Sequence, residues 1–303
     1  MKQKYKDVNF KSASLARIEQ CRAIIADYVS QGLRLTLRQL YYQCVTKNYF
    51  PNSEKSYKNL GSLVSDARLA GLLDWDAIED RVRVPRVPSE FEDLNELVDA
   101  ACASYRLPRT RDQDCYIELW VEKDALAGVL RPIASKYHVT MMVNRGYASQ
   151  SAMYESAKRF ISNTEMTGRN SALLYLGDFD PSGEDMVRDI RDRLEMFGVG
   201  VFTALEVEKI ALTMEQVEQY NPPPNPAKLT DPRAGEFVAK NGNESWEVDA
   251  LPPNVLTQII TDAIVSRMDM DKYEAFLAAE KVDIKKLKVM KEKLVKKGKK
   301  DNG

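Results

Sequence analysis

The sequence has 303 residues, of which 44% are hydrophobic and 29% are charged, and its formal net charge is −1. This length allows two domains that each bury a core, and no apolar run is long enough to span a bilayer. The first residues lack the apolar core of a signal peptide, so we expect a cytoplasmic protein. The sequence has no phosphate-binding loop of the form G-x-x-x-x-G-K-[ST], so we expect no ATP hydrolysis.

The histidine and cysteine content argues against two common kinds of site. Cys21, Cys44, Cys102 and Cys115 show no C-x-x-C spacing, and His138 is the single histidine of the sequence. A structural zinc site needs a denser set of such ligands. A serine or cysteine triad needs a histidine base, and His138 directly precedes an expected strand, where a loop histidine is the simpler interpretation.

The N-terminal part is expected to contain three helices and then a pair of strands. Apolar residues recur at helical spacing, residues suited to capping precede the helices, and glycine follows the first and the third. The expected helices are residues 14–32, 37–45 and 53–70, with Thr36 as the N-cap of the second. A short extended piece covers residues 33–35. The paired strands are expected at 75–78 and 81–84. This order is that of a winged helix-turn-helix, a fold that places a late helix against DNA.

The next part alternates strands with helices. It follows an expected helix at residues 90–105 and a linker at 106–114, and its short apolar runs are bounded by polar residues. The expected strands are 116–121, 139–143 and 173–176, and the expected helices begin near 124 and cover 149–161 and 184–197, with Pro181 opening the last. This alternation predicts a parallel sheet and therefore the α/β fold class.

Three acidic residues follow these strands. Glu122 follows the first strand, and Asp178 and Asp180 stand one residue apart after the third. The carboxyl ends of parallel strands are where ligands bind, so we expect these side chains to lie at that edge of the sheet. Carboxylates that converge repel one another unless a cation lies between them, and Mg²⁺ is a usual oxygen-bound ion. Each acid could instead be a helix N-cap, which explains any one of them better than all three.

The C-terminal part is expected to add a strand at residues 200–205, a proline-rich loop at 221–226 and a helix at 254–268. A basic tail follows, because residues 281–300 contain ten lysines against Asp283 and Glu292. The tail includes Lys285 and Lys286. It could contact DNA phosphates or form a solvated charged helix, and both interpretations stay open.

Two motifs together resemble one protein family. Val121-Glu122-Lys123-Asp124-Ala125 and Gly177-Asp178-Phe179-Asp180-Pro181-Ser182-Gly183 are similar to the acidic motifs of the Toprim domain of topoisomerases, primases and related nucleases. Their form is most similar to that in topoisomerase VI A subunits and the meiotic double-strand-break protein. Upstream, Thr36-Leu37-Arg38-Gln39-Leu40-Tyr41-Tyr42 resembles the winged-helix motif of the same family, in which a tyrosine attacks DNA.

The resemblance implies two domains and a tail. These would be a winged-helix domain with the catalytic tyrosine at 1–108, a Toprim metal-binding domain with a helical extension at 109–280, and the basic tail at 281–303. In the family an arginine precedes the nucleophilic tyrosine by four residues, as Arg38 precedes Tyr42, and four residues along a helix share one face. Tyr41 would point about 100° away and pack against the protein or make a secondary contact.

The resemblance also implies a DNA strand-cleaving transesterase. Tyr42 would attack double-stranded DNA and form a 5′-phosphotyrosine link, while Arg38 orients the phosphate. Mg²⁺ would be held by Glu122, Asp178 and Asp180, and Glu122 would serve as a ligand or as general acid and base for the 3′-oxygen. In the family the tyrosine of one subunit works with the metal site of the other, which implies a homodimer.

Two departures from the family pattern bear on partners. The tyrosine helix begins close to the first residue, so we expect neither the long N-terminal extension that binds the ATPase B subunit nor an obligate B subunit. The sequence most resembles the shortened, stand-alone A-subunit-like proteins called Mini-A, which implies a DNA-associated protein in a bacterial or phage-infected cell. Gly146-Tyr147-Ala148 stands where relatives often have a glycine followed by a proline.

Two other functions use parts of the same pattern. A metal-dependent Toprim nuclease would hydrolyse DNA with water, using the acids while the tyrosine is structural. A winged-helix DNA-binding protein would need no catalysis, but the complete set of Glu122, Asp178 and Asp180 argues against it.

Overall fold

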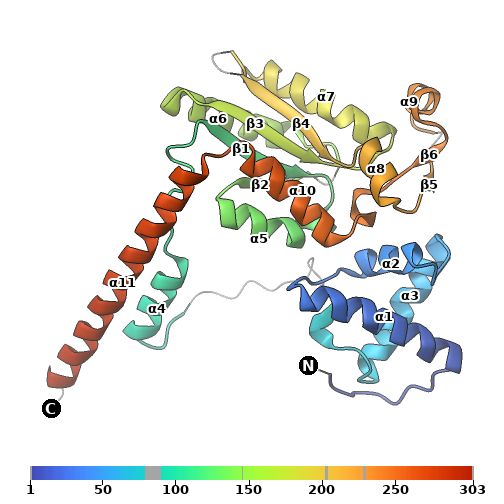
Figure 1. Cartoon of the computed structure of the whole chain (residues 1–303), viewed down its shortest axis with the longest axis horizontal. Helices are drawn as coiled ribbons and strands as arrows, with labels where there is room; N and C mark the ends of the chain where they lie inside the picture. Colours follow the sequence, from blue (N-terminus) through green and yellow to red (C-terminus); the bar gives the residue numbers. More distant parts are fainter. Residues whose placement is uncertain (1, 79–89, 145, 202–203, 228–229, 302–303) are drawn as a thin grey trace.

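The computed structural model describes residues 2–78, 90–144, 146–201, 204–227 and 230–301, with side chains up to residue 292. A bundle of three helices lies below a parallel sheet that is covered by helices on both faces, and a pair of helices projects from the sheet as an arm (Figure 1). Within the described part of the chain, no helix is both long and apolar enough to cross a membrane.

The N-terminal bundle consists of α1 (Ser12–Ser30), α2 (Leu37–Thr46) and α3 (Glu54–Leu69). Helix α2 begins where the sequence predicts, because the Thr36 side chain accepts a hydrogen bond from the backbone of Gln39 and the Gln39 side chain accepts one from the backbone of Thr36. Buried residues of all three helices form one apolar core, which includes Ile24, Leu40, Cys44, Leu60 and Val64.

The predicted strand at residues 75–78 is wrong over most of its length. Trp75–Ala77 is a short 3₁₀ helix, η1, because the Asp74 side chain accepts a hydrogen bond from the backbone N–H of Asp76 and stabilises a turn. Ile78 alone makes a strand-like bridge, parallel to Leu35. The second predicted strand of the hairpin, residues 81–84, lies outside the described residues.

The sheet has four parallel strands in the order β2-β1-β3-β4, which confirms the α/β class. The strands are β1 (Cys115–Val121), β2 (Thr140–Val143), β3 (Asn170–Leu176) and β4 (Leu205–Ala211). The strand predicted at 200–205 is therefore placed too early. Gly198 and Gly200 have φ values of 91° and 89°, which belong to a left-handed turn after the preceding helix rather than to a strand.

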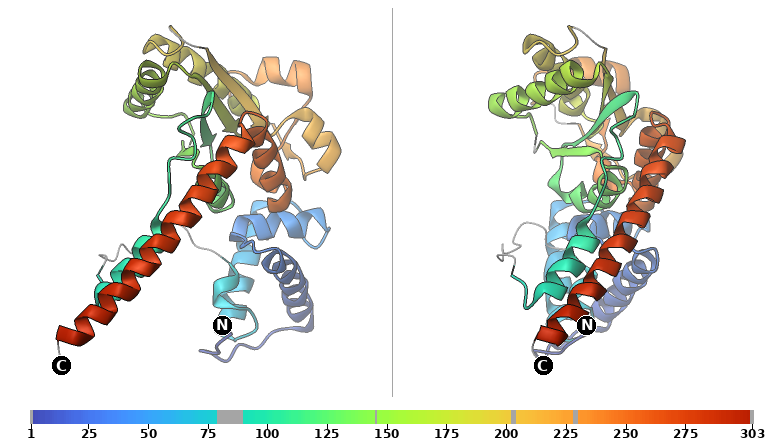
Figure 2. Two further views of the ribbon diagram at one scale, coloured as in Figure 1. Left: turned by 60° about the vertical axis from the view of Figure 1, so that its left-hand side comes forward. Right: turned by 90° about the vertical axis from the view of Figure 1, so that its left-hand side faces the viewer.

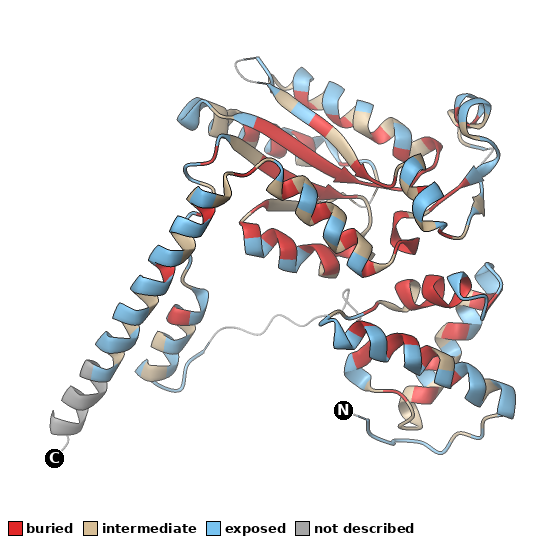
Figure 3. Cartoon of the chain, viewed as in Figure 1, coloured by how far each residue is buried: buried red, intermediate tan, exposed pale blue. Residues whose placement is uncertain are grey.

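Helices cover both faces of the sheet, so its two central strands are buried (Figure 3). The helices α5 (Ala127–Tyr137) and α10 (Pro253–Val265) pack on one face, and α6 (Gln150–Thr167) and α7 (Pro181–Met196) pack on the other. Successive side chains of a strand point to opposite faces. Accordingly, Leu174 and Leu176 join the core under α5 and α10, and Leu173 and Tyr175 join the core under α6 and α7.

The chain between β4 and α10 folds back onto the edge of the sheet. It contains α8 (Met214–Tyr220), β5 (Asn225–Pro226), α9 (Ala234–Asn241), β6 (Glu244–Ser245) and η3 (Val248–Ala250). The last two residues of the predicted loop at 221–226 are thus a short edge strand, a position that proline tolerates. Trp246 and Phe179 exchange backbone hydrogen bonds of 2.8 and 3.0 Å, which bring the residues after β6 to the end of β3.

The arm consists of α4 (Leu94–Ser104) and α11 (Met270–Asp301), which run side by side (Figures 1 and 2). Lys291 Nζ lies 2.5 Å from Asp99, and the Tyr105 hydroxyl donates to Asp283 at 2.9 Å. At the base of the arm, Arg109 forms a buried ion pair of 2.6 Å with Glu280. Helix α4, which falls within the predicted 1–108 domain, therefore packs on α11.

Candidate active site

Arg38 and Tyr42 lie one turn apart on α2 and face the same way, as their spacing predicts. Arg38 Nη2 is 3.4 Å from the Tyr42 hydroxyl, and the guanidinium carbon is 5.6 Å from the centre of the tyrosine ring. The Tyr42 side chain is nearly enclosed, since only 4% of the residue is exposed. The arrangement therefore places a phenol in contact with a cation at a position that is largely shielded from solvent.

The neighbouring Tyr41 has structural contacts. Its hydroxyl accepts a hydrogen bond of 2.7 Å from the Ser53 N–H and contacts the Asn52 side chain at 3.1 Å. Its ring packs edge to face on Tyr57. Tyr41 thus joins α2 to the start of α3.

Glu122 and Asp178 lie next to each other at the carboxyl ends of adjacent strands, as predicted. Val121 is in register with Leu176, so the residues after β1 and β3 meet. The backbone N–H of Asp178 donates to Glu122 Oε2 at 3.3 Å, and the Tyr175 hydroxyl is 3.4 Å from the same oxygen. The strand pairing therefore brings together two acids that are far apart in the sequence.

Asp180 is the N-cap of α7. Its Oδ1 accepts hydrogen bonds from the Gly183 N–H at 2.7 Å and from the Ser182 hydroxyl at 2.8 Å. Asp180 thus takes the capping role that the sequence left open for each of the three acids. Both hydrogen bonds are accepted by Oδ1, and neither uses Oδ2. The turn is tight, because a Cβ added to Gly183 would lie 2.1 Å from the backbone oxygen of Asp178.

Two further acids and a lysine complete the cluster, and the sequence did not predict them as site residues. Glu247 and Asp249 belong to residues 247–249, here named the acidic turn. Arg38 contacts Glu247 and forms an ion pair of 2.7 Å with Asp249. Lys123 Nζ lies 2.8 Å from Asp178, 2.9 Å from Glu247 and 3.1 Å from Asp249.

The acidic turn is fixed by the backbone on both sides. Trp246 pairs with Phe179, and the N–H of Val248 donates to Asp178 Oδ1 at 2.9 Å. Asp249 is fully buried. Of these three residues, only Lys123 could have been suspected from the sequence, because it stands inside the first acidic motif. The acidic turn belongs to no helix or strand whose periodicity would predict which way Glu247 and Asp249 point.

The cluster has more negative than positive groups. Arg38 pairs with Glu247 and Asp249, and Lys123 pairs with these two acids and with Asp178. Glu122 lies beside Asp178 and accepts a hydrogen bond from its backbone. Burial, together with the charges of Glu122 and Asp249, raises the pKa of Asp178 to about 7 against the attraction of Lys123. When all four carboxylates are ionised they outnumber the two cations by two, so a further cation would favour the ionised form of Asp178.

Burial also acts on the two groups nearest to α2. It raises the pKa of the Tyr42 phenol, and the negative charges of Glu247 and Asp249 raise it further. Burial by itself raises the pKa of Glu247, but Lys123 and Arg38 outweigh this effect and lower it to about 2. The phenol is therefore neutral and Glu247 is ionised at ordinary pH.

The charge excess suits a divalent ion. Among the described residues, no group of three or more His, Cys, Asp or Glu side chains has the geometry to hold a metal ion. The donor chemistry nevertheless fits Mg²⁺, because this ion prefers carboxylate oxygens, and Asp178 is a buried carboxyl whose pKa is raised first by that burial and then by the charges of Glu122 and Asp249. Glu122, Asp178 and Asp180 are the residues that would hold it.

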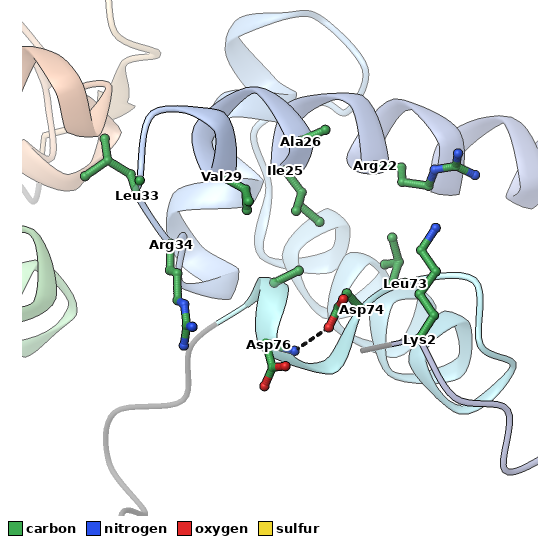
Figure 4. A pocket seen from close by; sticks show the side chains of 12 residues that line it. Lys2, Arg22, Ile25, Ala26, Val29, Leu33, Arg34, Leu73, Asp74 and Asp76 are labelled. Atoms are coloured by element: carbon green, nitrogen blue, oxygen red, sulfur yellow. Dashed lines mark hydrogen bonds between the residues drawn. The ribbon is translucent and has the colours of Figure 1, made fainter.

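Other predicted and cavity-lining residues lie outside this cluster. Lys285 and Lys286 are on the arm, where Lys286 Nζ is 2.9 Å from Asp283. A cavity of about 500 Å³ lies between α1 and the residues around η1. Ile25 and Val29 of α1 line one wall, and Leu73 lines the opposite wall (Figure 4). Its lining includes neither Tyr42 nor the predicted acids.

Comparison with family models and with curated proteins finds no match to this sequence. The functional interpretation therefore depends on the motifs and on the geometry of the cluster.

Proposed function

We propose that the protein is a DNA strand-cleaving transesterase that resembles the topoisomerase VI A subunit. One observation carries the proposal most directly: Arg38 donates a hydrogen bond to Tyr42, and ion pairs lead from Arg38 through Glu247 and Lys123 to Asp178. The tyrosine motif and the acidic motif come from separate parts of the sequence. Their contact within one chain supports a reaction that uses both motifs.

In the proposed reaction, the Tyr42 oxygen attacks a phosphodiester, forms a 5′-phosphotyrosine link and releases a 3′-hydroxyl. Arg38 orients the phosphate, because a guanidinium can bind two phosphate oxygens as it binds carboxylates here. Glu122, Asp178 and Asp180 would hold Mg²⁺. When bound, the ion would supply charge neutralisation at the phosphate and at the leaving oxygen.

The proposed partners are double-stranded DNA and a second copy of the chain. A homodimer would present two tyrosines and two acid clusters to a duplex and could cut both strands. No ATPase B subunit is required for cleavage in this proposal, which makes the protein functionally similar to the stand-alone shortened A-subunit-like proteins.

One observation favours a second candidate, a Toprim nuclease that uses water. The Tyr42 side chain is nearly buried and the pKa of its phenol is raised by that burial, so the phenol is harder to ionise than a free tyrosine. Water activated at Glu122, Asp178 and Asp180 would not need this group. The two candidates differ in the product that they leave on the DNA 5′ end.

The deciding experiment traps that product. The protein is incubated with supercoiled DNA and Mg²⁺ and then denatured with detergent, and protein that remains on the DNA 5′ ends is detected on a gel. The transesterase predicts a covalent adduct in the wild type and in Tyr41→Phe. Tyr42→Phe should lose both the adduct and the break while it keeps its fold and DNA binding.

Breaks with free 5′-phosphates that persist in Tyr42→Phe would establish the nuclease instead. If the wild-type protein binds DNA but makes no break with Mg²⁺ present, the result would favour a winged-helix DNA-binding protein without catalysis. The Tyr41→Phe protein is the matched control, because it removes a neighbouring hydroxyl from the same helix.

A further inference from the structure

We infer that Glu247 is a further catalytic residue, the carboxylate that accepts the phenol proton of Tyr42 as the tyrosine oxygen attacks phosphorus. This inference rests on the proposed transesterase function and assigns a role to a residue outside the tyrosine and acidic motifs. Tyr42 must lose a proton at that step, and the phenol needs an acceptor within hydrogen-bond reach.

The geometry brings the two groups to one nitrogen atom. Arg38 Nη2 contacts Glu247 Oε2 and also lies 3.4 Å from the Tyr42 hydroxyl. The negative charge of Glu247 also reaches the phenol, since after burial it is a cause that raises the pKa of Tyr42. The phenol oxygen and the carboxylate therefore flank the same nitrogen, which makes Glu247 the proton acceptor that this geometry favours.

Glu247 is held in place by groups other than the tyrosine. Lys123 Nζ contacts the same carboxylate oxygen at 2.9 Å, and the backbone pairing of Trp246 with Phe179 fixes the start of the acidic turn. A nucleophile, a base beside it and a third group that orients the base form the usual arrangement of an activated nucleophile. Here these parts are Tyr42, Glu247 and Lys123.

The other candidate bases are less well placed. Asp249 directs Oδ2 to Arg38 and Oδ1 to Lys123, and it is completely buried. Glu122 is bonded on the side of Tyr175 and Asp178. His138 follows α5 and precedes β2, so it lies at the opposite edge of the sheet from the acids, which follow the strands.

The strength of the base would depend on the substrate. Arg38 and Lys123 together keep the pKa of Glu247 low, so the carboxylate is a weak base in the DNA-free protein. A phosphate that takes over either cation would remove part of this effect. Glu247 would then accept a proton more readily when DNA is in place.

The attack transfers the phenol proton to Glu247, exchanges one bond at phosphorus and protonates the leaving oxygen. The O–H bond of Tyr42 breaks and its proton moves to Glu247, while a bond forms between the tyrosine oxygen and phosphorus. The bond between phosphorus and the 3′-oxygen breaks, and that oxygen leaves with the bonding pair and takes up a proton from solvent. In religation the same proton returns from Glu247 to the phenol oxygen.

The test compares adduct formation in full-length variants. Glu247→Gln keeps the size of the side chain and removes its basicity, so the rate of Tyr42 adduct formation should fall by about 10²- to 10⁴-fold. Replacing Tyr42 by 3,5-difluorotyrosine, whose phenol ionises more readily, should restore much of that rate in Glu247→Gln. A purely structural role for Glu247 would give no such rescue.

Two variants serve as controls. Asp249→Asn removes an ion pair from the same two cations, and its loss should not be rescued by difluorotyrosine. Glu244→Gln changes an exposed acid of the neighbouring strand β6 and should leave the rate unchanged. An unchanged rate in Glu247→Gln, or rescue that is equal in Asp249→Asn, would overturn the inference.

A measurement without DNA separates this inference from the proposed function. The fluorine signal of difluorotyrosine at position 42 reports the ionisation of the phenol directly. Its pKa should be lower in Glu247→Gln than in the parent protein, because a neighbouring negative charge is removed. An unchanged phenol pKa would refute the contact itself, whereas a shifted pKa in a protein that forms no adduct would refute only the transesterase.

Discussion

Helix α2 and the carboxyl edge of the sheet contribute to the cluster in different ways. Arg38 and Tyr42 are four residues apart, and a single turn of helix with a local cap fixes their relation. Glu122 and Asp178 are placed by the pairing of β1 with β3, and the acidic turn is placed by Trp246 against Phe179. The first half of the cluster is local in the sequence, whereas the second exists only when distant segments meet.

The two halves also complement each other electrically. The helix supplies the cation Arg38, and its partners Glu247 and Asp249 come from the acidic turn. Each half by itself would leave charge unpaired in a partly buried place, which is costly. The contact between the bundle and the sheet therefore depends on the same groups that the proposed reaction uses.

The largest effect is expected from the sheet edge. Asp178→Asn or Asp180→Asn should reduce cleavage of supercoiled DNA on the order of 10³-fold or more, because these variants remove charge stabilisation at the phosphate. Circular dichroism should show an unchanged fold. Asp185→Asn, which changes an acid on α7 outside the cluster, is the control. Full activity of both variants with Mg²⁺ present would refute the Toprim assignment.

A mixing experiment tests whether the two halves must belong to one chain. In this structure Arg38 and Tyr42 lie beside acids of their own chain, whereas the resemblance implies that each tyrosine works at the metal site of its partner. A mixture of Tyr42→Phe and Asp178→Asn proteins should then recover part of the nicking activity. No recovery after demonstrated subunit exchange would mean that the site is formed within one chain.

The tight turn at the sheet edge should be sensitive to one methyl group. Gly183→Ala places a Cβ against the backbone oxygen of Asp178 and should lower the free energy of unfolding by about 1–3 kcal/mol. Gly235→Ala, at a helical position with open space, should instead raise it by about 0.4–1 kcal/mol. Denaturant unfolding measures both, and equal effects would contradict the close approach.

The pH dependence of stability should report Asp178. Its pKa is raised from an ordinary value of 3.8 to about 7, so between these pH values the folded protein keeps a proton that the unfolded chain has released. This contribution therefore favours folding below pH 4 and falls as pH rises to 7, at about 1.4 kcal/mol per unit of pKa difference at most. Without divalent ions, Asp178→Asn should flatten the dependence over this range.

The matched control has a shift of opposite sign. Hydrogen bonding from Arg188 lowers the pKa of Asp185 to about 2, so its contribution is complete above the unfolded value and disappears only at more acidic pH. Asp185→Asn should leave the slope between pH 4 and 7 unchanged. A slope that responds equally to both variants would show that Asp178 is not the group responsible.

The smallest effect is expected from the arm. If Lys285 and Lys286 bind phosphates, changing both to Gln should flatten the dependence of log affinity on log salt by about 0.9 for each phosphate that is no longer neutralised. Lys158→Gln, on α6, should leave the slope unchanged. An unchanged slope in the double variant would make the tail a solvated helix.

The sequence by itself determined the features that short segments control. Thr36 and Gln39 begin α2, Arg38 and Tyr42 share a face, and Glu122, Asp178 and Asp180 follow strands because apolar runs end there. The alternation of strands and helices was sufficient for the α/β class. Each of these features depends on periodicity or on a cap within a few residues.

Tertiary structure decided the remainder, and the errors show why. The strand expected at 75–78 became a turn because the Asp74 side chain captured a backbone N–H, and β4 began after Gly198 and Gly200 rather than with them. The positions of Glu247 and Asp249 could not be read from periodicity, since they depend on a backbone pairing with residues near Phe179. Such pairing is set by the packing of the whole sheet, so only the folded chain could bring the acidic turn to Arg38 and Lys123.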